Sequence, residues 1–159
     1  MAASKPVKIT LHEDKPLFRE AILYTARKTG LNAALVEKDY FCSVLLANLC
    51  DGCERPPVFR GGTCLSKIHA DFYRLSEDLD FTISLSPATS RSDRSRMVTP
   101  VKDWISVLGK ESSVFKIEQK LTGFNNSKQY VAQIAYPTVV SSGVGRIKIE
   151  VGLREEILV

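Results

Sequence analysis

The chain has 159 residues, of which 44% are hydrophobic and 25% are charged, and its formal net charge is +4; these values are typical of one soluble globular domain. No apolar run approaches the ~20 residues needed to cross a bilayer, and residues 1–16 lack the apolar core of a signal peptide. We therefore exclude a transmembrane or exported protein and expect a cytoplasmic one with no membrane partner, whose mild positive charge suits a nucleotide or nucleic-acid partner.

The first part of the chain has the pattern of two helices. Asp14 can cap a helix over Pro16–Lys28, and Gly30 can end it. A 3–4 spacing of apolar residues predicts a second helix over Ala33–Leu49, which an Asp-Gly pair and two prolines then break. We therefore expect residues 1–56 to form an N-terminal helical part.

Residues 57–159 are expected to contain the sheet. Strands are predicted at Val58–Arg60 and Leu79–Leu85, with a short helix over Thr63–Ala70 between them. A polar loop over residues 86–95 precedes a helix over Met97–Leu108 that starts near Pro100. Three strand-like runs follow, with Asn125-Asn126 as a hairpin turn: Ser113–Thr122, Gln129–Tyr136 and Gly145–Leu153. Helices followed by a mixed sheet indicate a single α+β (α/β) domain.

Two aspartates interrupt the apolar pattern of the strand over Leu79–Leu85. Side chains at spacing two share a face, so Ser76, Asp78 and Asp80 lie opposite the apolar stripe. Two carboxylates on one face repel each other unless a cation lies between them, and hard oxygen ligands suit Mg²⁺ or Mn²⁺. A solvent-facing strand with two ordinary acids explains the pattern equally well.

The last strand repeats this arrangement. Arg146, Lys148, Glu150 and Gly152 share the face opposite its apolar residues. If this strand neighbours Leu79–Leu85, Glu150 becomes a third carboxylate beside the aspartates. Three acids can hold two divalent ions, which clamp the attacking and leaving oxygens of a phosphoryl displacement. Taken alone, Glu150 is better explained as a surface residue.

A glycine pair precedes the aspartate strand. Gly61-Gly62 allows close backbone approach, and the start of the following helix offers free N–H groups to an anion. Thr63 and Lys67 are four residues apart and share a helix face, where a hydroxyl and an ammonium can bind phosphate. The pattern is not a Walker loop, because no Gly-Lys-Ser/Thr follows at the required distance.

Other residues are open to two interpretations. The spacing of Cys50 and Cys53 suits zinc or redox chemistry, but without a second pair we expect reduced structural thiols. The charged run Glu37–Asp39 is either an exposed stripe or internal ion pair, or it supports the site. Three aromatic residues could stack on bases, although core packing is favoured: Trp104, Phe115 and Phe124.

Three motifs resemble one family. Gly61–Lys67 (GGTCLSK), Arg74–Phe81 (RLSEDLDF) and Val36–Tyr40 (VEKDY), the last followed by Phe41, resemble the nucleotidyltransferase family of AbiEii/AbiGii-type toxins. The resemblance implies a polymerase-beta-like nucleotidyltransferase fold, with a mixed β-sheet flanked by helices and the N-terminal helices packed on it. It also implies a toxin of a toxin–antitoxin or phage-defence system.

The resemblance further implies the reaction and its residues. Such a toxin moves NMP from an NTP to an acceptor such as tRNA or another RNA, with Mg²⁺ or Mn²⁺, and pairs with an antitoxin protein. Asp78, Asp80 and Glu150 would bind metal, and these three acids together with Lys67 would be catalytic. The nucleotide site would comprise seven residues: Gly61, Gly62, Thr63, Ser66, Lys67, Arg74 and Ser76.

The chain departs from the family pattern in two ways. Cys64 stands where a small Ala or Ser is usual. Family members normally continue into a helical second half, so we expect either a truncated protein or a reduced variant. The alternative function is therefore a catalytically incomplete module that binds nucleotide, RNA or an antitoxin.

Overall fold

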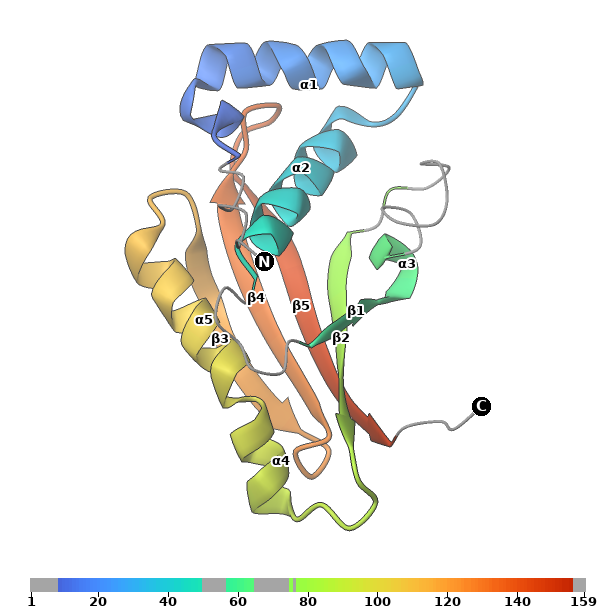
Figure 1. Ribbon diagram of the computed structural model, residues 1–159. Coiled ribbons are helices and arrows are strands. Elements are labelled where there is room, and N and C mark those ends of the chain that lie inside the picture. The colour runs from blue at the N-terminus through green and yellow to red at the C-terminus, as the bar shows by residue number, and fades with distance from the viewer. Residues whose placement is uncertain (1–8, 50–56, 65–74, 76, 156–159) are drawn as a thin grey trace, which may run out of the picture.

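The computed structural model describes residues 9–49, 57–64, 75 and 77–155. Its elements in chain order are η1 Leu11–Glu13, α1 Lys15–Thr29, α2 Ala33–Ala47, β1 Val58–Arg60, α3 Gly61–Cys64, β2 Asp78–Leu85, α4 Arg91–Met97, α5 Thr99–Glu111, β3 Lys116–Phe124, β4 Gln129–Pro137 and β5 Val144–Glu155. The strands form a five-stranded sheet in the order β1-β2-β5-β4-β3 (Figure 1). The predicted α+β class with a mixed sheet is therefore confirmed.

The two N-terminal helices form where their end signals lie. Asp14 accepts a hydrogen bond from the Leu17 backbone N–H at 3.1 Å, and α1 ends at Gly30, whose φ of 74° is left-handed. Asn32 caps α2 in the same way. Both predicted helices are confirmed, although α2 ends at Ala47, two residues before the predicted end.

The sheet is mixed because one pair of strands is parallel. β2 and β5 run parallel at its centre, and the other neighbouring pairs are antiparallel. The β3–β4 hairpin turns at residues 125–127, where Asn125, Asn126 and Ser127 all have positive φ. Asparagine tolerates this conformation better than most residues, which explains the predicted turn.

Other helix boundaries also differ from prediction. Residues 91–95 were predicted as loop, but α4 covers them, because the Ser90 hydroxyl accepts a hydrogen bond from the Asp93 backbone N–H and starts a helix. The predicted start near Pro100 is confirmed by α5, which begins at Thr99. The helix predicted from Thr63 begins two residues earlier, at Gly61, and its predicted remainder lies outside the described residues.

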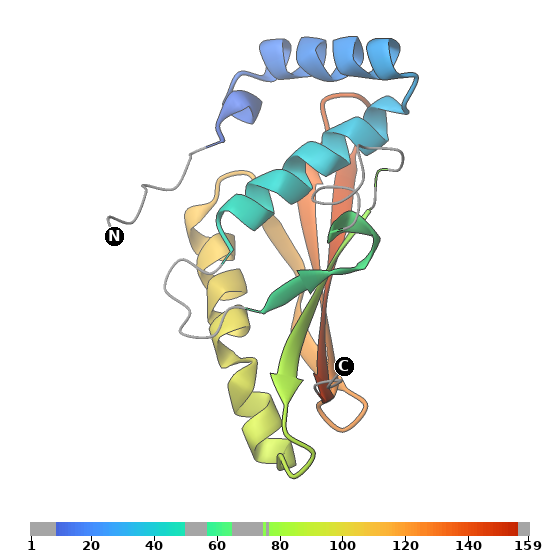
Figure 2. The same cartoon turned by 45° about the vertical axis from the view of Figure 1, so that its right-hand side comes forward.

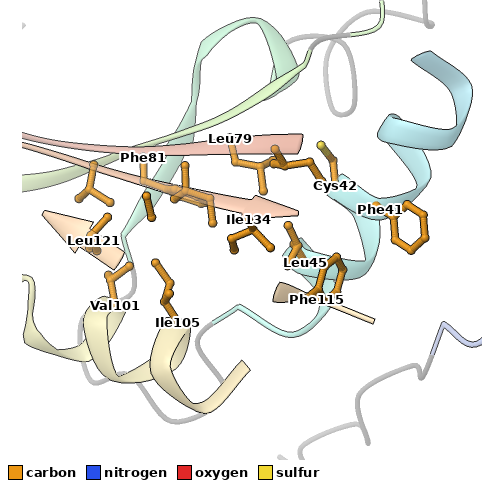
Figure 3. Close-up of a cluster of buried hydrophobic side chains, with 14 of the residues drawn as sticks. Phe41, Cys42, Leu45, Leu79, Phe81, Val101, Ile105, Phe115, Leu121 and Ile134 are labelled. Carbon is orange, nitrogen blue, oxygen red and sulfur yellow. The ribbon is translucent and has the colours of Figure 1, made fainter. Parts of the chain in front are cut away.

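The core lies between one face of the sheet and the helices. Figure 2 shows α2, α4 and α5 on the same side of the sheet. Apolar side chains of the strands, among them Leu79 and Phe81 of β2 and Ile134 of β4, lie in one buried cluster with apolar side chains of the helices. Leu45 of α2 and Val101 of α5 belong to the same cluster (Figure 3). The opposite face carries the polar side chains of β2 and β5. Among the described helices, none is both long and apolar enough to cross a bilayer.

Candidate active site

The three predicted acids lie together on the polar face of the sheet. In the parallel register of β2 and β5, Asp80 pairs with Glu150 and Asp78 pairs with Lys148. Leu79 and Ile149, between them, are fully buried on the core face. The condition set by the sequence is therefore met: the last strand neighbours the aspartate strand, and Glu150 stands beside Asp80.

A lysine lies between two of these acids. The Lys148 ammonium Nζ is 3.2 Å from Asp78 Oδ2 and 2.8 Å from Glu150 Oε1. These hydrogen bonds raise the pKa of Lys148, so it is a cation at neutral pH. The sequence placed Lys148 on the same face as Glu150 but gave it no role. Lys148 is two residues from Glu150 on one strand, and this spacing could have indicated that the two side chains are neighbours.

Asp80 lies in an electrostatically unfavourable position for a carboxylate. Burial raises its pKa first, and the neighbouring carboxylates of Glu150 and Asp78 raise it further, while Arg60 and Lys148 oppose the rise. Arg60 pairs directly with Asp80 across β1 and β2. Sequence reasoning missed Arg60, because strand pairing cannot be read from a three-residue strand. A cation beside Asp80 relieves this repulsion.

Gly61 brings the glycine pair against the aspartate strand. Its φ is 78°, and a Cβ at this position would collide with the Asp80 carboxylate. Only glycine combines the left-handed backbone with this contact. Gly62 and Thr63 follow within α3, whose residues pack against β2. The predicted phosphate-binding turn and the predicted metal strand are therefore adjacent.

Some predicted residues fall outside the described part of the chain. These are Ser66, Lys67, Arg74 and Ser76 of the nucleotide site, and the pair Cys50 and Cys53. Of the described cysteines, Cys42 is buried, Cys64 is partly buried, and both are free thiols. They agree with the expected reduced structural thiols.

The charged run on α2 contacts both the sheet and the site. Glu37 is 1% exposed and accepts hydrogen bonds from Thr138 Oγ1 at 2.5 Å and from the Val139 backbone N–H at 2.6 Å. An exposed stripe is therefore wrong for Glu37. Lys38 Nζ lies 3.0 Å from Glu77 Oε2, next to Asp78 in the chain. Lys38 thus contacts the residue before β2, whereas Glu37 holds the segment after β4.

The three aromatic candidates have different environments. Phe115 is buried in the core, and the Trp104 indole donates a hydrogen bond to the Asn48 carbonyl at 2.8 Å. Phe124 is 50% exposed, so core packing is wrong for this residue. It is the last residue of β3, which is an edge strand of the sheet.

The acids have the right chemistry for a divalent cation. Within the described residues, no three His, Cys, Asp or Glu side chains are already gathered around one point. Asp78 and Glu150 nevertheless converge on one cationic atom, the Lys148 ammonium, and Asp80 stands next to them. Hard carboxylate oxygens around a cationic position suit Mg²⁺ or Mn²⁺, once Lys148 moves aside.

Comparison with known sequences identifies the family. Residues 44–158 match the model of a family described as nucleotidyl transferase AbiEii toxin, type IV toxin–antitoxin system. The match covers more than half of the chain, and the chain therefore belongs to this family. The resemblance inferred from the motifs is therefore confirmed at the level of the family. Val36–Tyr40 lies before the matched region.

One solved structure is also similar to the chain. It is from H. pylori and is assigned provisionally as a nucleotidyltransferase, with 19% sequence identity and a TM-score of 0.48. The similarity covers 77% of this chain and 46% of that chain, so the present chain spans less than half of that protein's length. No curated protein matches the sequence.

Proposed function

We propose that the chain is a metal-dependent nucleotidyltransferase that transfers NMP from an NTP to an RNA acceptor such as tRNA. The observation that carries this proposal is the register of β2 and β5, which sets Glu150 beside Asp80 on the face that also holds Asp78. Family membership supports the reaction class. We also propose that residues 1–159 act as one domain, with a helical part at 1–56 and a sheet core at 57–159.

Asp78, Asp80 and Glu150 would hold Mg²⁺ or Mn²⁺, which would supply the positive charge that stabilises an in-line displacement at the α-phosphate. Gly61 keeps the chain close to Asp80, so a triphosphate at the start of α3 would lie beside these acids. Thr63, Ser66 and Lys67 would bind that triphosphate, and Arg74 and Ser76 would bind phosphate or orient Asp78.

The remaining carboxylate has a second role. Glu150 lies at the edge of the acid group, next to β4, where Val131 is its partner. It would accept the proton of the attacking acceptor hydroxyl, because an acceptor can approach along β4 and β5 on this face. The protein would act in the cytoplasm and would have an antitoxin protein as its partner; the description of its family as part of a type IV toxin–antitoxin system supports the antitoxin.

A second function is favoured by the position of Lys148. Its ammonium occupies the space between Asp78 and Glu150 that a metal would need. If Lys148 stays there, the chain would be a catalytically incomplete module that binds nucleotide, RNA or an antitoxin without turnover.

The test incubates the protein with each α-labelled NTP, Mg²⁺ or Mn²⁺, and total RNA. The matched variant carries Asp78→Ala and Asp80→Ala, and Ser84→Ala on the same face of β2 is the control. We expect label transfer with the wild type and the control, and none with the double variant. Equal transfer by all three proteins would refute the catalytic assignment, and nucleotide binding without transfer would favour the second function.

A further inference from the structure

A cavity of about 500 Å³ opens beside Glu150 on the polar face of the sheet. It lies between β5 and the β3–β4 hairpin, and its lining includes Arg60, Phe124, Lys128 and Arg154 as well as Glu150. Most of its described lining comes from β5 and the β3–β4 hairpin, and Arg60 is the lining residue on β1. The cavity therefore extends the acid group toward the hairpin.

Strand register explains the shape of this cavity. Val131 pairs with Glu150, and Gln129 pairs with Gly152 one step further along the strands. Gly152 has no side chain, so the space above it, between Arg60 and the end of β5, stays open. A Cβ on residue 152 would contact the Arg60 guanidinium at 3.5 Å. The result is a groove that begins at a carboxylate and leads to the hairpin.

The charges along the groove are mostly positive. Arg60, Lys128 and Arg154 contribute three cations, against the single carboxylate of Glu150 at one end. Lys128 and Arg154 are exposed, and Arg60 Nε is buried without a hydrogen-bond partner among the described residues. A row of cations that ends at an acid suits a chain of phosphates whose terminal hydroxyl meets that acid.

The hairpin holds an aromatic ring in place at the far end of the groove. Phe124 is half exposed, directly before the turn at residues 125–127. Arg94 Nε on α4 donates a hydrogen bond to the Asn126 carbonyl at 3.2 Å, and the Leu153 backbone N–H donates to the Lys128 carbonyl at 2.8 Å. These bonds fix the turn to α4 and to β5. An exposed ring beside cations, next to a turn held by these bonds, is a stacking platform for bases.

We infer that this groove binds the acceptor as a single strand of RNA, with a base stacked on Phe124 and phosphates on Lys128, Arg154 and Arg60. This inference rests on the proposed function, because it uses Glu150 as the acid that receives the acceptor hydroxyl. The combination of cations with one flat ring favours RNA over a protein partner. It favours RNA over the NTP because most of the described lining comes from β5 and the β3–β4 hairpin, and Arg60 is the one described lining residue on β1, next to the predicted phosphate-binding turn.

The test measures RNA affinity directly, without catalysis. A fluorescein-labelled single-stranded RNA of about 12 nucleotides is titrated with protein at about 100 mM salt, without NTP or metal. The variants are Phe124→Ala, Lys128→Glu and Arg154→Glu. Their matched controls lie on α1, α5 and α4: Tyr24→Ala, an aromatic residue that is 62% exposed, Lys110→Glu and Arg91→Glu. Thermal unfolding midpoints verify that every variant is folded.

We expect each groove variant to raise the Kd for RNA about 10-fold, and each control to change it less than about 2-fold. Phe124→Trp should retain wild-type affinity, because the larger ring also stacks. Equal effects of groove and control variants, or no effect of either set, would overturn the inference.

Additional measurements distinguish RNA from other ligands of the groove, and distinguish failure of the groove assignment from failure of the proposed reaction. If Phe124→Ala weakens a non-hydrolysable NTP analogue but not RNA, the groove is a base site for the NTP, and the acceptor assignment is wrong. If it weakens only binding of the antitoxin protein, the groove is a protein interface and the inference is also wrong. If only groove variants lose RNA affinity but the wild type transfers no label, the RNA-binding groove is supported and the proposed reaction is refuted. If the wild type transfers label but the groove variants keep their RNA affinity, the reaction is supported and the RNA-binding groove is refuted.

Discussion

The two faces of the central sheet are built from the same strands and serve different purposes. On the covered face, Leu79, Phe81 and Ile149 are at most 1% exposed and pack under the helices. On the polar face, Asp78, Asp80 and Glu150 gather although their charges repel. Since side chains alternate along each strand, one face can supply the stability that lets the other keep an electrostatically unfavourable group. Changes on the two faces should therefore have opposite consequences.

The largest expected effect comes from the covered face. Phe81→Ala should lower the free energy of unfolding by about 3–5 kcal/mol, because it removes a buried ring and leaves a cavity. Chemical denaturation measures the loss. Ser84→Ala, three residues away on the exposed side of β2, should change it by less than about 0.5 kcal/mol. If both variants lost a similar amount of unfolding free energy, the covered face would not be the main source of stability.

The next effect comes from the polar face and has the opposite sign for stability. Asp80→Asn should lower label transfer at least about 100-fold, because a charged ligand beside Glu150 is lost. The same change should leave the free energy of unfolding unchanged or raise it by about 0.5 kcal/mol, since repulsion is relieved and solvent screens the rest. Denaturation and transfer assays on one preparation compare the two. A clear loss of stability would contradict the strain assigned to Asp80.

Glu37 is an exception that sharpens the comparison, because it is a charged residue buried on the covered side. Glu37→Ala should lower the free energy of unfolding by about 1–3 kcal/mol, since Thr138 Oγ1 and the Val139 backbone N–H lose their acceptor. The exposed Glu20→Ala on α1 is the control. If Glu37→Ala were as mild as the control, its hydrogen bonds would not hold α2 to the sheet.

The smallest effect concerns the cation on the polar face. Lys148→Met should raise the affinity for Mn²⁺ about 3- to 10-fold, because a competing ammonium is removed from Asp78 and Glu150. It should also lower the free energy of unfolding of the metal-free protein by a few tenths of a kcal/mol. Calorimetric titration measures the affinity. Arg146→Met, which breaks the pair with Glu118, should leave Mn²⁺ affinity unchanged; weaker binding by Lys148→Met would refute the competition.

Local patterns in the sequence predicted most elements and the strand face on which the candidate site acids lie. The helix cap at Asp14, the alternation in β2 and β5 and the Asn125-Asn126 turn depend on neighbouring residues alone, and the structure contains them. α4 was missed because its charged residues have no apolar period, and only the Ser90 cap indicated a helix. The pairing of motifs Gly61–Lys67 and Arg74–Phe81 pointed to the family before any fold was known.

What the sequence determined by itself was which residues share a face, because the periods of two and 3.6 residues follow from backbone geometry. Only the tertiary structure decided which faces meet. β2 and β5 are far apart in the chain, and packing under α2 and α5 places them side by side, so that Glu150 joins Asp80. The same packing puts Lys148 between the acids and leaves Phe124 exposed at the end of the groove. Strand order depends on how the whole core is filled, and no local pattern encodes it.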